Sequence, residues 1–173
     1  TLVESENNYI VALSERGGRV GFAILDVSTG EFAAGEELRA DAERSLGAVR
    51  FREAIVPADS PSLYALAKSL SASCVVDERP PFEFESEAAL ETLRSHFGRD
   101  GGALSGFEKR DLAISSAGAL LAYVKELRRR PLAHVTELHQ VVSNDFLFLD
   151  SETLRNLEVF EPVRGDTSRM PRC

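Results

Sequence analysis

Four carboxylates stand near the ends of segments that we expect to form strands or helices: Asp26, Asp77, Glu78 and Asp111. Clustered carboxylates hold the two Mg²⁺ ions, about 4 Å apart, of metal-dependent nucleases. Such a nuclease also carries an acidic residue on its first strand, and the first expected strand, residues 8–13, has none. We therefore keep a metal-dependent nuclease as the alternative function, and expect Asp26 to accept hydrogen bonds within the turn that follows it.

The other residues able to carry out chemistry are arranged less favourably. His134 and His139 are five positions apart in an expected extended segment, which places them on opposite faces and disfavours a paired metal site. The three histidines of the chain do not suggest a Ser-His-Asp set, and the sequence contains no Gly-x-x-x-x-Gly-Lys-Ser/Thr P-loop. We accordingly predict no catalytic, metal-binding or cofactor-binding residue in this chain.

Arg128, Arg129 and Arg130 form a basic run at the end of the longest expected helix. Positive charge at the C-terminal end of a helix interacts favourably with the helix dipole. A solvated helix end therefore accounts for the three arginines, and no ligand is required. The same guanidinium groups could contact phosphate. The sequence leaves open whether Arg128–Arg130 approaches DNA.

The composition indicates a soluble, acidic protein of one domain with part of a second. The chain has 173 residues, 43% of them hydrophobic and 28% charged, and a formal net charge of -8. An acidic surface repels phosphate, which argues against general nucleic-acid or membrane binding. Cys74 and Cys173 do not suggest a disulfide framework, and no apolar run reaches the roughly 18 residues of a membrane span. Because the chain begins at Thr1 without an initiator Met or signal peptide, we interpret it as a piece of a longer cytoplasmic protein.

The stretch from Val20 to Phe32 organises the expected fold. Seven of its first eight residues are apolar or Gly, which predicts a central strand buried on both faces. Ser28-Thr29-Gly30 supplies a turn in which Gly30 takes positive φ, and residues 31–35 return as the next strand. With residues 8–13 these segments predict an antiparallel meander of three strands.

The rest of the pattern alternates helices with short strands. Single helices between strands imply parallel pairing, so we predict an α/β protein with an RNase H-like mixed sheet, the antiparallel meander plus parallel strands, and flanking helices. The expected helices are 36–50, 61–71, 86 or 87 to 97, 111–129 and 152–159; the expected strands or extended segments are 53–57, 74–76, 80–85, 135–142 and 145–149.

Two of these helices carry further predictions. The helix ending at Phe97 turns a polar stripe outward, formed by Glu87, Glu91, Thr92 and Arg94, and a solvated surface explains that stripe without a partner. In helix 111–129, Gly118 costs about 1 kcal/mol relative to Ala. We expect close packing at Gly118 to compensate for this cost.

Four stretches, in this order and spacing, resemble the MutS mismatch-repair family. The fourth is similar to the family's Leu-Asp-x-x-Thr-x-Arg-Asn-Leu-Glu signature, with Leu154 where a polar residue is common. The stretches are Asn-Asn-Tyr-Ile-Val-Ala from Asn7, Gly-Phe-Ala-Ile-Leu-Asp-Val-Ser-Thr-Gly-Glu-Phe from Gly21, Ser-Ala-Gly-Ala-Leu-Leu-Ala-Tyr from Ser116, and Phe-Leu-Asp-Ser-Glu-Thr-Leu-Arg-Asn-Leu-Glu from Phe148.

This resemblance implies that residues 1–145 are the connector domain, which in the family has an RNase H-like fold without nuclease activity. Residues 146–173 would be the start of the core (lever) domain. The mismatch-reading domain would precede Thr1 and the ATPase domain would follow Cys173, so the chain itself would not be an enzyme. ATP and Mg²⁺ would bind, and mismatched DNA would be held, only in the full-length parent, which is expected to be a dimer.

The resemblance also implies a mechanical role. The connector would couple the mismatch-binding and ATPase domains and offer a docking surface to MutL. Glu91 and Thr92 fall at a MutL-contact position of the family, where some relatives have polar amides. We therefore predict that the stripe of Glu87, Glu91, Thr92 and Arg94 meets MutL.

Overall fold

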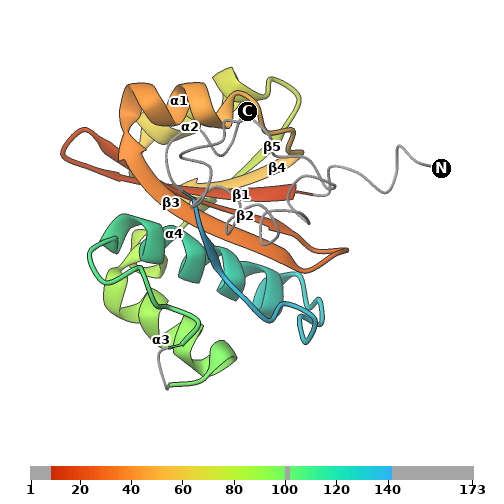
Figure 1. Ribbon diagram of the computed structural model, residues 1–173. Helices are drawn as coiled ribbons and strands as arrows, with labels where there is room; N and C mark the ends of the chain where they lie inside the picture. The colour runs from red at the N-terminus through yellow and green to blue at the C-terminus, as the bar shows by residue number, and fades with distance from the viewer. Residues whose placement is uncertain (1–8, 100–101, 142–173) are drawn as a thin grey trace, which may run out of the picture.

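Six strands pair into one mixed sheet in the computed structural model, which describes residues 9–99 and 102–141. The strand order across the sheet is β5-β4-β1-β2-β3-β6 (Figure 1). The strands are β1 (Tyr9–Arg16), β2 (Arg19–Asp26), β3 (Glu31–Leu38), β4 (Glu53–Pro57), β5 (Val75–Arg79) and β6 (His139–Gln140).

The sheet combines antiparallel and parallel pairing. Strands β1, β2 and β3 form the antiparallel meander, with Ala12 opposite Ala23 and Ile24 opposite Ala33. Parallel pairs extend it on both sides, because β4 pairs with β1, β5 with β4, and β6 with β3. The predicted α/β class with a mixed sheet is confirmed, and its arrangement agrees with an RNase H-like fold.

Helices cover both faces of this sheet (Figure 1). On one face lie α1 (Arg39–Leu46) and α2 (Pro61–Leu70), and on the other lie α3 (Ser86–Phe97) and α4 (Asp111–Ala122). A 3₁₀ turn, η2 (Pro81–Phe84), precedes α3, and a π-helical turn, η3 (Tyr123–Leu127), continues α4. None of the helices in the described ranges is long and apolar enough to cross a membrane.

Strand β2 is the buried centre of the molecule. Phe22 and Ile24 pack into the core beneath α1 and α2, whereas Ala23 and Leu25 pack into the core beneath α3 and α4. Each of these four side chains is fully buried. The two cores explain why the strand is apolar at successive positions, and they confirm the prediction of a doubly covered central strand.

Close packing of α3 against α4 also follows the prediction. A Cβ atom at Gly118 would lie 2.3 Å from the Cβ of Ala89, so no side chain fits there without moving the helices apart. The residue that weakens α4 as an isolated helix thus permits its contact with α3.

The predicted helix over 36–50 is wrong in its first turn. Strand β3 continues to Leu38, and α1 begins only at Arg39 and ends at Leu46. Glu36 and Glu37 pair with Gly21 and Val20 of β2. Long-range pairing in the sheet therefore overrides the helical spacing of this segment.

Segments near the sheet edges also differ from the sequence expectation. The expected buried strand 74–76 is instead β5, an edge strand in which Val75 is 66% exposed. The segment 80–85, expected to be extended, contains the turn η2. Within the described part of the segment 135–142, strand β6 comprises His139–Gln140, and the following N–H, of Val141, donates to the Ala34 carbonyl of β3. The expected strand 145–149, the helix 152–159 and the domain part 146–173 lie outside the described residues.

Candidate protein-docking surface

The turn after β2 is built on Asp26 and Gly30. The Asp26 Oδ1 atom accepts hydrogen bonds from the Ser28 backbone N–H at 3.0 Å, the Ser28 hydroxyl at 2.7 Å and the Thr29 N–H at 3.3 Å. The Gly30 N–H donates to the Asp26 carbonyl at 2.8 Å, and Gly30 has a φ of 86°. These contacts are those that the turn-forming role requires.

The remaining acidic residues considered for nuclease chemistry have different surroundings. Asp77 accepts a hydrogen bond from the Tyr123 hydroxyl at 2.9 Å, and Asp111 lies 3.9 Å from Arg16. Glu78 is exposed on the edge strand. Across residues 9–99 and 102–141, no three His, Cys, Asp or Glu side chains come together in a way that could hold a metal ion.

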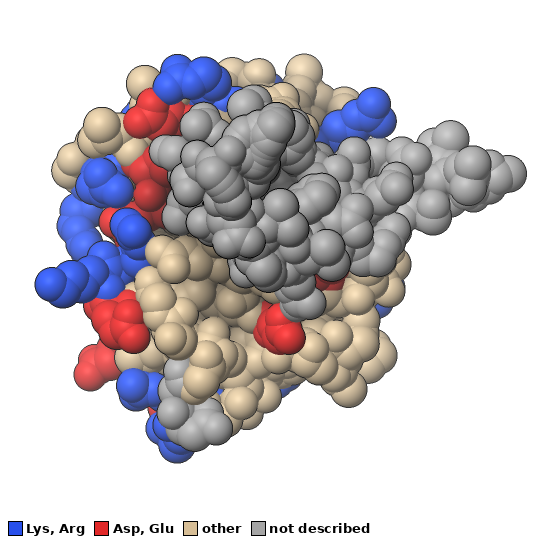
Figure 2. Space-filling model, in the orientation of Figure 1, with Lys and Arg blue, Asp and Glu red and all other residues tan. Residues whose placement is uncertain are grey.

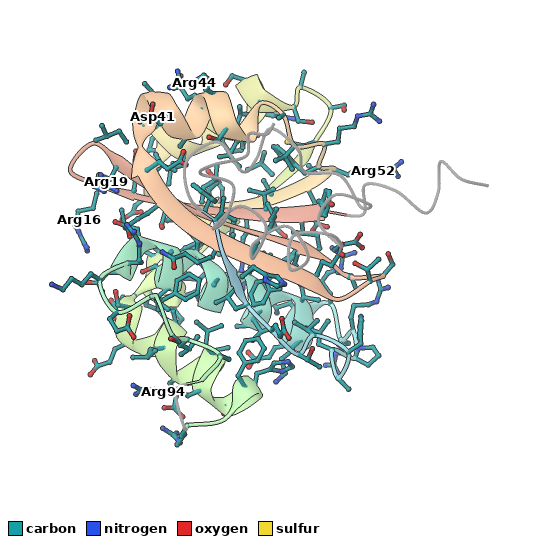
Figure 3. The ribbon with its side chains drawn as sticks, viewed as in Figure 1. Arg16, Arg19, Asp41, Arg44, Arg52 and Arg94 are labelled. Carbon is teal, nitrogen blue, oxygen red and sulfur yellow. The ribbon has the colours of Figure 1, made fainter. Side chains whose placement is uncertain are left out.

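The predicted polar stripe lies on α3. This helix buries Ala89 and Leu93 against the core and ends at Gly98, whose φ is 104°. Glu87, Glu91 and Arg94 are exposed on its outward side, and Arg94 points away from the body of the molecule (Figure 3).

Two stripe residues have intramolecular partners. Arg99 donates to the Glu91 carboxylate, in an ion pair between exposed side chains. Thr92 is only half-exposed, and its hydroxyl donates to the Ala88 carbonyl at 3.2 Å. Thr92 therefore does not share the outward side with Glu91 but turns toward a neighbouring hollow.

This hollow, the α3–η2–η3 groove, has a volume of about 210 Å³. Two large apolar side chains stand at its rim, because Phe82 is 62% exposed and Leu127 is 50% exposed. The residues that line it are Arg79, Phe82, Glu83, Ala88, Thr92, Ala122, Tyr123, Glu126 and Leu127. An exposed apolar pair beside a polar helix face is a frequent feature of protein-interaction surfaces.

The sequence pattern missed this groove. Leu127 follows Leu120 and Val124 at helical spacing, which predicts that it is buried with them. The π-helical turn η3 inserts extra residues into the helical repeat and rotates Leu127 away from the core. Phe82 lies in a segment expected to be extended, where the period-2 pattern does not decide its orientation.

A polar network ties η3 to the edge of the sheet. The Tyr123 hydroxyl lies 2.5 Å from Glu53 Oε2 and 2.9 Å from Asp77 Oδ2, and Arg128 Nη1 lies 2.6 Å from both Glu53 oxygens. The Arg79 guanidinium lies 6.0 Å from the centre of the Tyr123 ring. Burial, and then the hydrogen bond to Glu53, raises the pKa of Tyr123, so the phenol keeps its proton.

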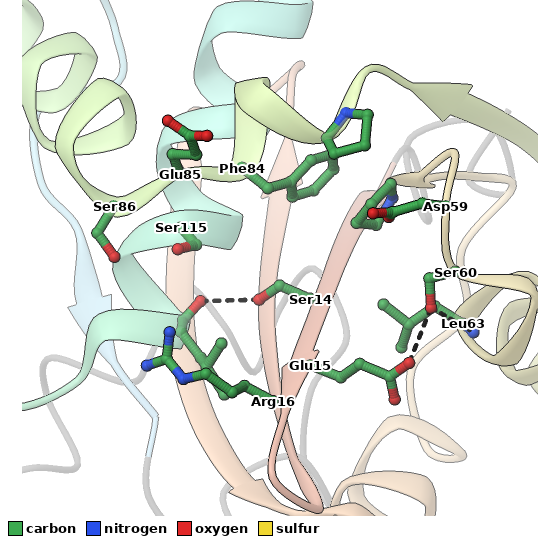
Figure 4. Close-up of a pocket in the computed structure, with 13 residues that line it drawn as sticks. Ser14, Glu15, Arg16, Asp59, Ser60, Leu63, Phe84, Glu85, Ser86 and Ser115 are labelled. Atoms are coloured by element: carbon green, nitrogen blue, oxygen red, sulfur yellow. Dashed lines mark hydrogen bonds between the residues drawn. The ribbon is translucent and has the colours of Figure 1, made fainter.

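A larger hollow, of about 490 Å³, lies where β1 and β4 end (Figure 4). Ser60 caps α2, because its hydroxyl accepts the Leu63 N–H at 3.2 Å and donates to Glu15 at 2.8 Å. The Ser14 hydroxyl donates to the Leu112 carbonyl at 3.1 Å. These hydroxyl groups hold α2 and α4 against the strand ends.

Acidic and basic side chains alternate along the side of the molecule where Arg16 and Arg19 lie (Figure 2 and Figure 3). Arg19 lies 3.3 Å from Glu36, whose carboxylate also accepts the Leu112 N–H at 2.9 Å at the start of α4. This side is therefore a mixed-charge surface, and its charges do not select between anionic and cationic ligands.

The fold and its surface define an α/β domain. Most of the polar side chains described above form hydrogen bonds or ion pairs that stabilise turns, helix ends and the sheet edge. Residues 8–136 match the family model of MutS domain II. The chain belongs to the MutS DNA mismatch-repair family and contains its connector domain, which confirms the family predicted from the sequence.

Two curated relatives illustrate the similarity, both named DNA mismatch repair protein MutS. The protein from Methanosarcina acetivorans is 34% identical over 191 residues, which cover 98% of this chain and 21% of the relative. The protein from Symbiobacterium thermophilum is 36% identical over 177 residues, which cover 97% of this chain and 20% of the relative. The chain therefore spans about one fifth of the length of these relatives.

Proposed function

We propose that this chain is the noncatalytic connector of a DNA mismatch-repair MutS protein. In this proposal residues 1–145 form the connector and residues 146–173 begin the core (lever) domain. The mismatch in the DNA is read, and ATP and Mg²⁺ are bound, by other domains of a dimeric, cytoplasmic parent protein. The family match over residues 8–136 supports this assignment, because domain II is the part of the family that the chain contains.

The connector couples the mismatch-binding and ATPase domains as a rigid body. The doubly covered strand β2 and the contact of Gly118 with Ala89 favour this role, because a close-packed interior transmits displacement instead of absorbing it.

The connector also offers a docking surface to MutL. The observation that carries this part is the exposed pair Phe82 and Leu127, which stands beside the stripe of α3. The apolar pair would supply buried contact area, and the exposed Glu87, Glu91 and Arg94, with Thr92 at the groove, would set the specificity.

Binding of purified cognate MutL to the immobilised 173-residue chain tests this proposal. Phe82→Ala combined with Leu127→Ala should raise the Kd about tenfold or more, since apolar anchors dominate interface energies. The matched control is Leu38→Ala with Val75→Ala, because these residues are 55% and 66% exposed but lie away from the groove. Equal losses in the two double variants would contradict a role for the groove.

The charged part of the surface has its own matched pair. Glu91 pairs with Arg99 on α3, and Glu43 pairs with Arg39 on α1, and both glutamates are exposed. Glu91→Lys should weaken MutL binding several-fold, and Glu43→Lys should not. If MutL binds neither this chain nor the full-length parent, the docking role is wrong.

Incubation of the chain with nicked and branched DNA plus Mg²⁺ or Mn²⁺ distinguishes the nuclease alternative from the connector proposal. We expect no cleavage. Cleavage that Asp26→Asn abolishes would overturn the connector proposal in favour of the nuclease.

A further inference from the structure

A second hollow, the arginine hollow, lies at the end of the sheet where β1 and β4 begin. Its volume is about 210 Å³, and it receives arginines from two separate parts of the chain, Arg52 before β4 and Arg128 and Arg130 after η3. Its remaining wall comes from Tyr9, Ile10, Val27, Ser28 and Glu53. We propose that the arginine hollow binds a backbone phosphate of DNA.

The three arginines are not equivalent. Arg128 forms an ion pair with Glu53 at 2.6 Å, so its charge is already compensated. Arg52 and Arg130 are exposed, and neither forms an ion pair with any residue of the described ranges. Two positive charges that the fold does not use therefore face the same small hollow.

Backbone contacts hold both arginines in place. The Arg52 N–H donates to the Tyr9 carbonyl at 3.4 Å, and its carbonyl accepts from Val75 at 2.9 Å, so its main chain is anchored between two strands. The Arg130 N–H donates to the Val124 carbonyl at 3.2 Å and closes the end of the helix. A charge on an anchored backbone binds with less loss of entropy than one on a free loop.

The turn that presents Arg130 ends the helix. Arg129 has a φ of 54°, in the left-handed region common just after a helix, and the following N–H, of Arg130, bonds back to the Val124 carbonyl. This conformation reverses the chain, so that Arg130 lines the arginine hollow and Arg129 does not.

The ligand chemistry follows from the donors. Guanidinium groups bind the paired oxygens of a phosphate through two parallel hydrogen bonds. An enclosed site for free phosphate would also need backbone N–H groups, but the N–H groups of Ser28 and Thr29 donate to Asp26. Exposed arginines without such a cradle suit a polyanion, whose backbone presents successive phosphates to them.

The arginine hollow is also distinct from the docking surface. The residues that line the arginine hollow and those that line the α3–η2–η3 groove do not overlap, although Tyr123 of the groove is hydrogen-bonded to Glu53 of the hollow. Arg52 also lies far from Arg94 of the stripe in Figure 3. The inference therefore does not depend on MutL binding, and the two can fail separately.

Fluorescence anisotropy of a labelled DNA duplex, titrated with the 173-residue chain at several salt concentrations, tests the inference. The test variant is Arg52→Gln with Arg130→Gln, and the control is Arg50→Gln with Arg129→Gln, which removes the same charge from positions outside the hollow. We expect the test variant to lose about tenfold in affinity at low salt and the control less than about twofold. The slope of log K against log salt should fall by about 2 in the test variant, at about 0.9 per phosphate contact.

Two further measurements make the outcome decisive. Arg52→Lys with Arg130→Lys should retain most of the salt slope, because the charge remains while the bidentate geometry is lost. Inorganic phosphate, titrated as a competitor and followed directly by NMR, distinguishes the source of the anion. Equal losses in the two Gln variants, absence of DNA binding at low salt, or binding of phosphate without DNA would each overturn the proposal.

Discussion

Strand β2 and the first two residues of β5 are apolar in sequence, yet the two strands differ in burial. In β2, Ile24 is completely buried between two layers of helices, whereas Val75 in β5 is 66% exposed at the sheet edge. Only three places in the strand order separate β2, which is covered on both faces, from β5, which lies at the edge of the sheet. The comparison teaches that apolar content predicts a strand, and that only its rank in the sheet decides its burial.

The largest expected effect is that of Ile24→Asp, which should unfold the domain. An unpaired carboxylate in a doubly covered strand has no partner to offset its desolvation, so we expect a loss of more than about 4 kcal/mol. Val75→Asp is the control at the edge and should cost less than about 1 kcal/mol. Urea unfolding measures both, and a near-native curve for Ile24→Asp would refute the assignment of β2.

Gly118→Ala should destabilise the domain by about 2 kcal/mol, although Ala favours an isolated helix by about 1 kcal/mol. The new methyl group would meet the Cβ of Ala89 at 2.3 Å, which forces α3 away from α4. Adding Ala89→Gly should recover part of the loss. A double-mutant cycle from thermal melts checks this, and additive effects would show that the two sites are independent.

Asp26→Ala should cost about 1 kcal/mol. The substitution leaves the N–H groups of Ser28 and Thr29 without their acceptor, but Ser28 is exposed and Thr29 is only partly buried, so water replaces part of the lost hydrogen bonding. Asp26→Asn keeps an acceptor oxygen and should lose less. Equal losses in the two variants, measured by urea unfolding, would argue against the turn-forming role.

The smallest expected effect concerns Glu37, a buried carboxyl in β3. Burial raises its pKa, so the folded state holds this proton more tightly than the unfolded state. The resulting stability is fully present below the unfolded pKa and is lost as pH rises through the folded pKa. Glu37→Gln should therefore raise stability at neutral pH by about 1 kcal/mol or less and flatten the pH profile between acidic and neutral pH.

Glu36→Gln is the matched neighbour for this measurement. The Glu36 carboxylate accepts hydrogen bonds from the backbone N–H groups of Leu112 and Ala113 at the start of α4. A negative charge at this end of a helix interacts favourably with the helix dipole. Glu36→Gln should therefore lower the stability of the domain at neutral pH, whereas Glu37→Gln should raise it. Shifts of the same sign in thermal melts would show that burial does not distinguish the two residues.

Much of the fold could be predicted because local patterns and global packing agree. The apolar run of β2, the Ser60 cap of α2 and the glycine that ends α3 each specify an element from a few neighbouring residues. The stripe on α3 was predicted as one helix face. The sequence did not predict that Thr92 lines the groove while Glu91 lies on the outward side. The α3–η2–η3 groove escaped prediction because a π-helical turn breaks the period on which the pattern depends.

By itself the sequence determined the class of fold, the central strand and the membership of the MutS family, because periodicity, turn residues and ordered motifs are local properties. Only the tertiary structure decided that Glu36 belongs to strand β3 and not to a helix, that Val75 is exposed, and that Arg52 and Arg130 line the same hollow. These outcomes depend on residues far apart in the chain. Their pairing energies outweigh the local preferences that a sequence pattern records.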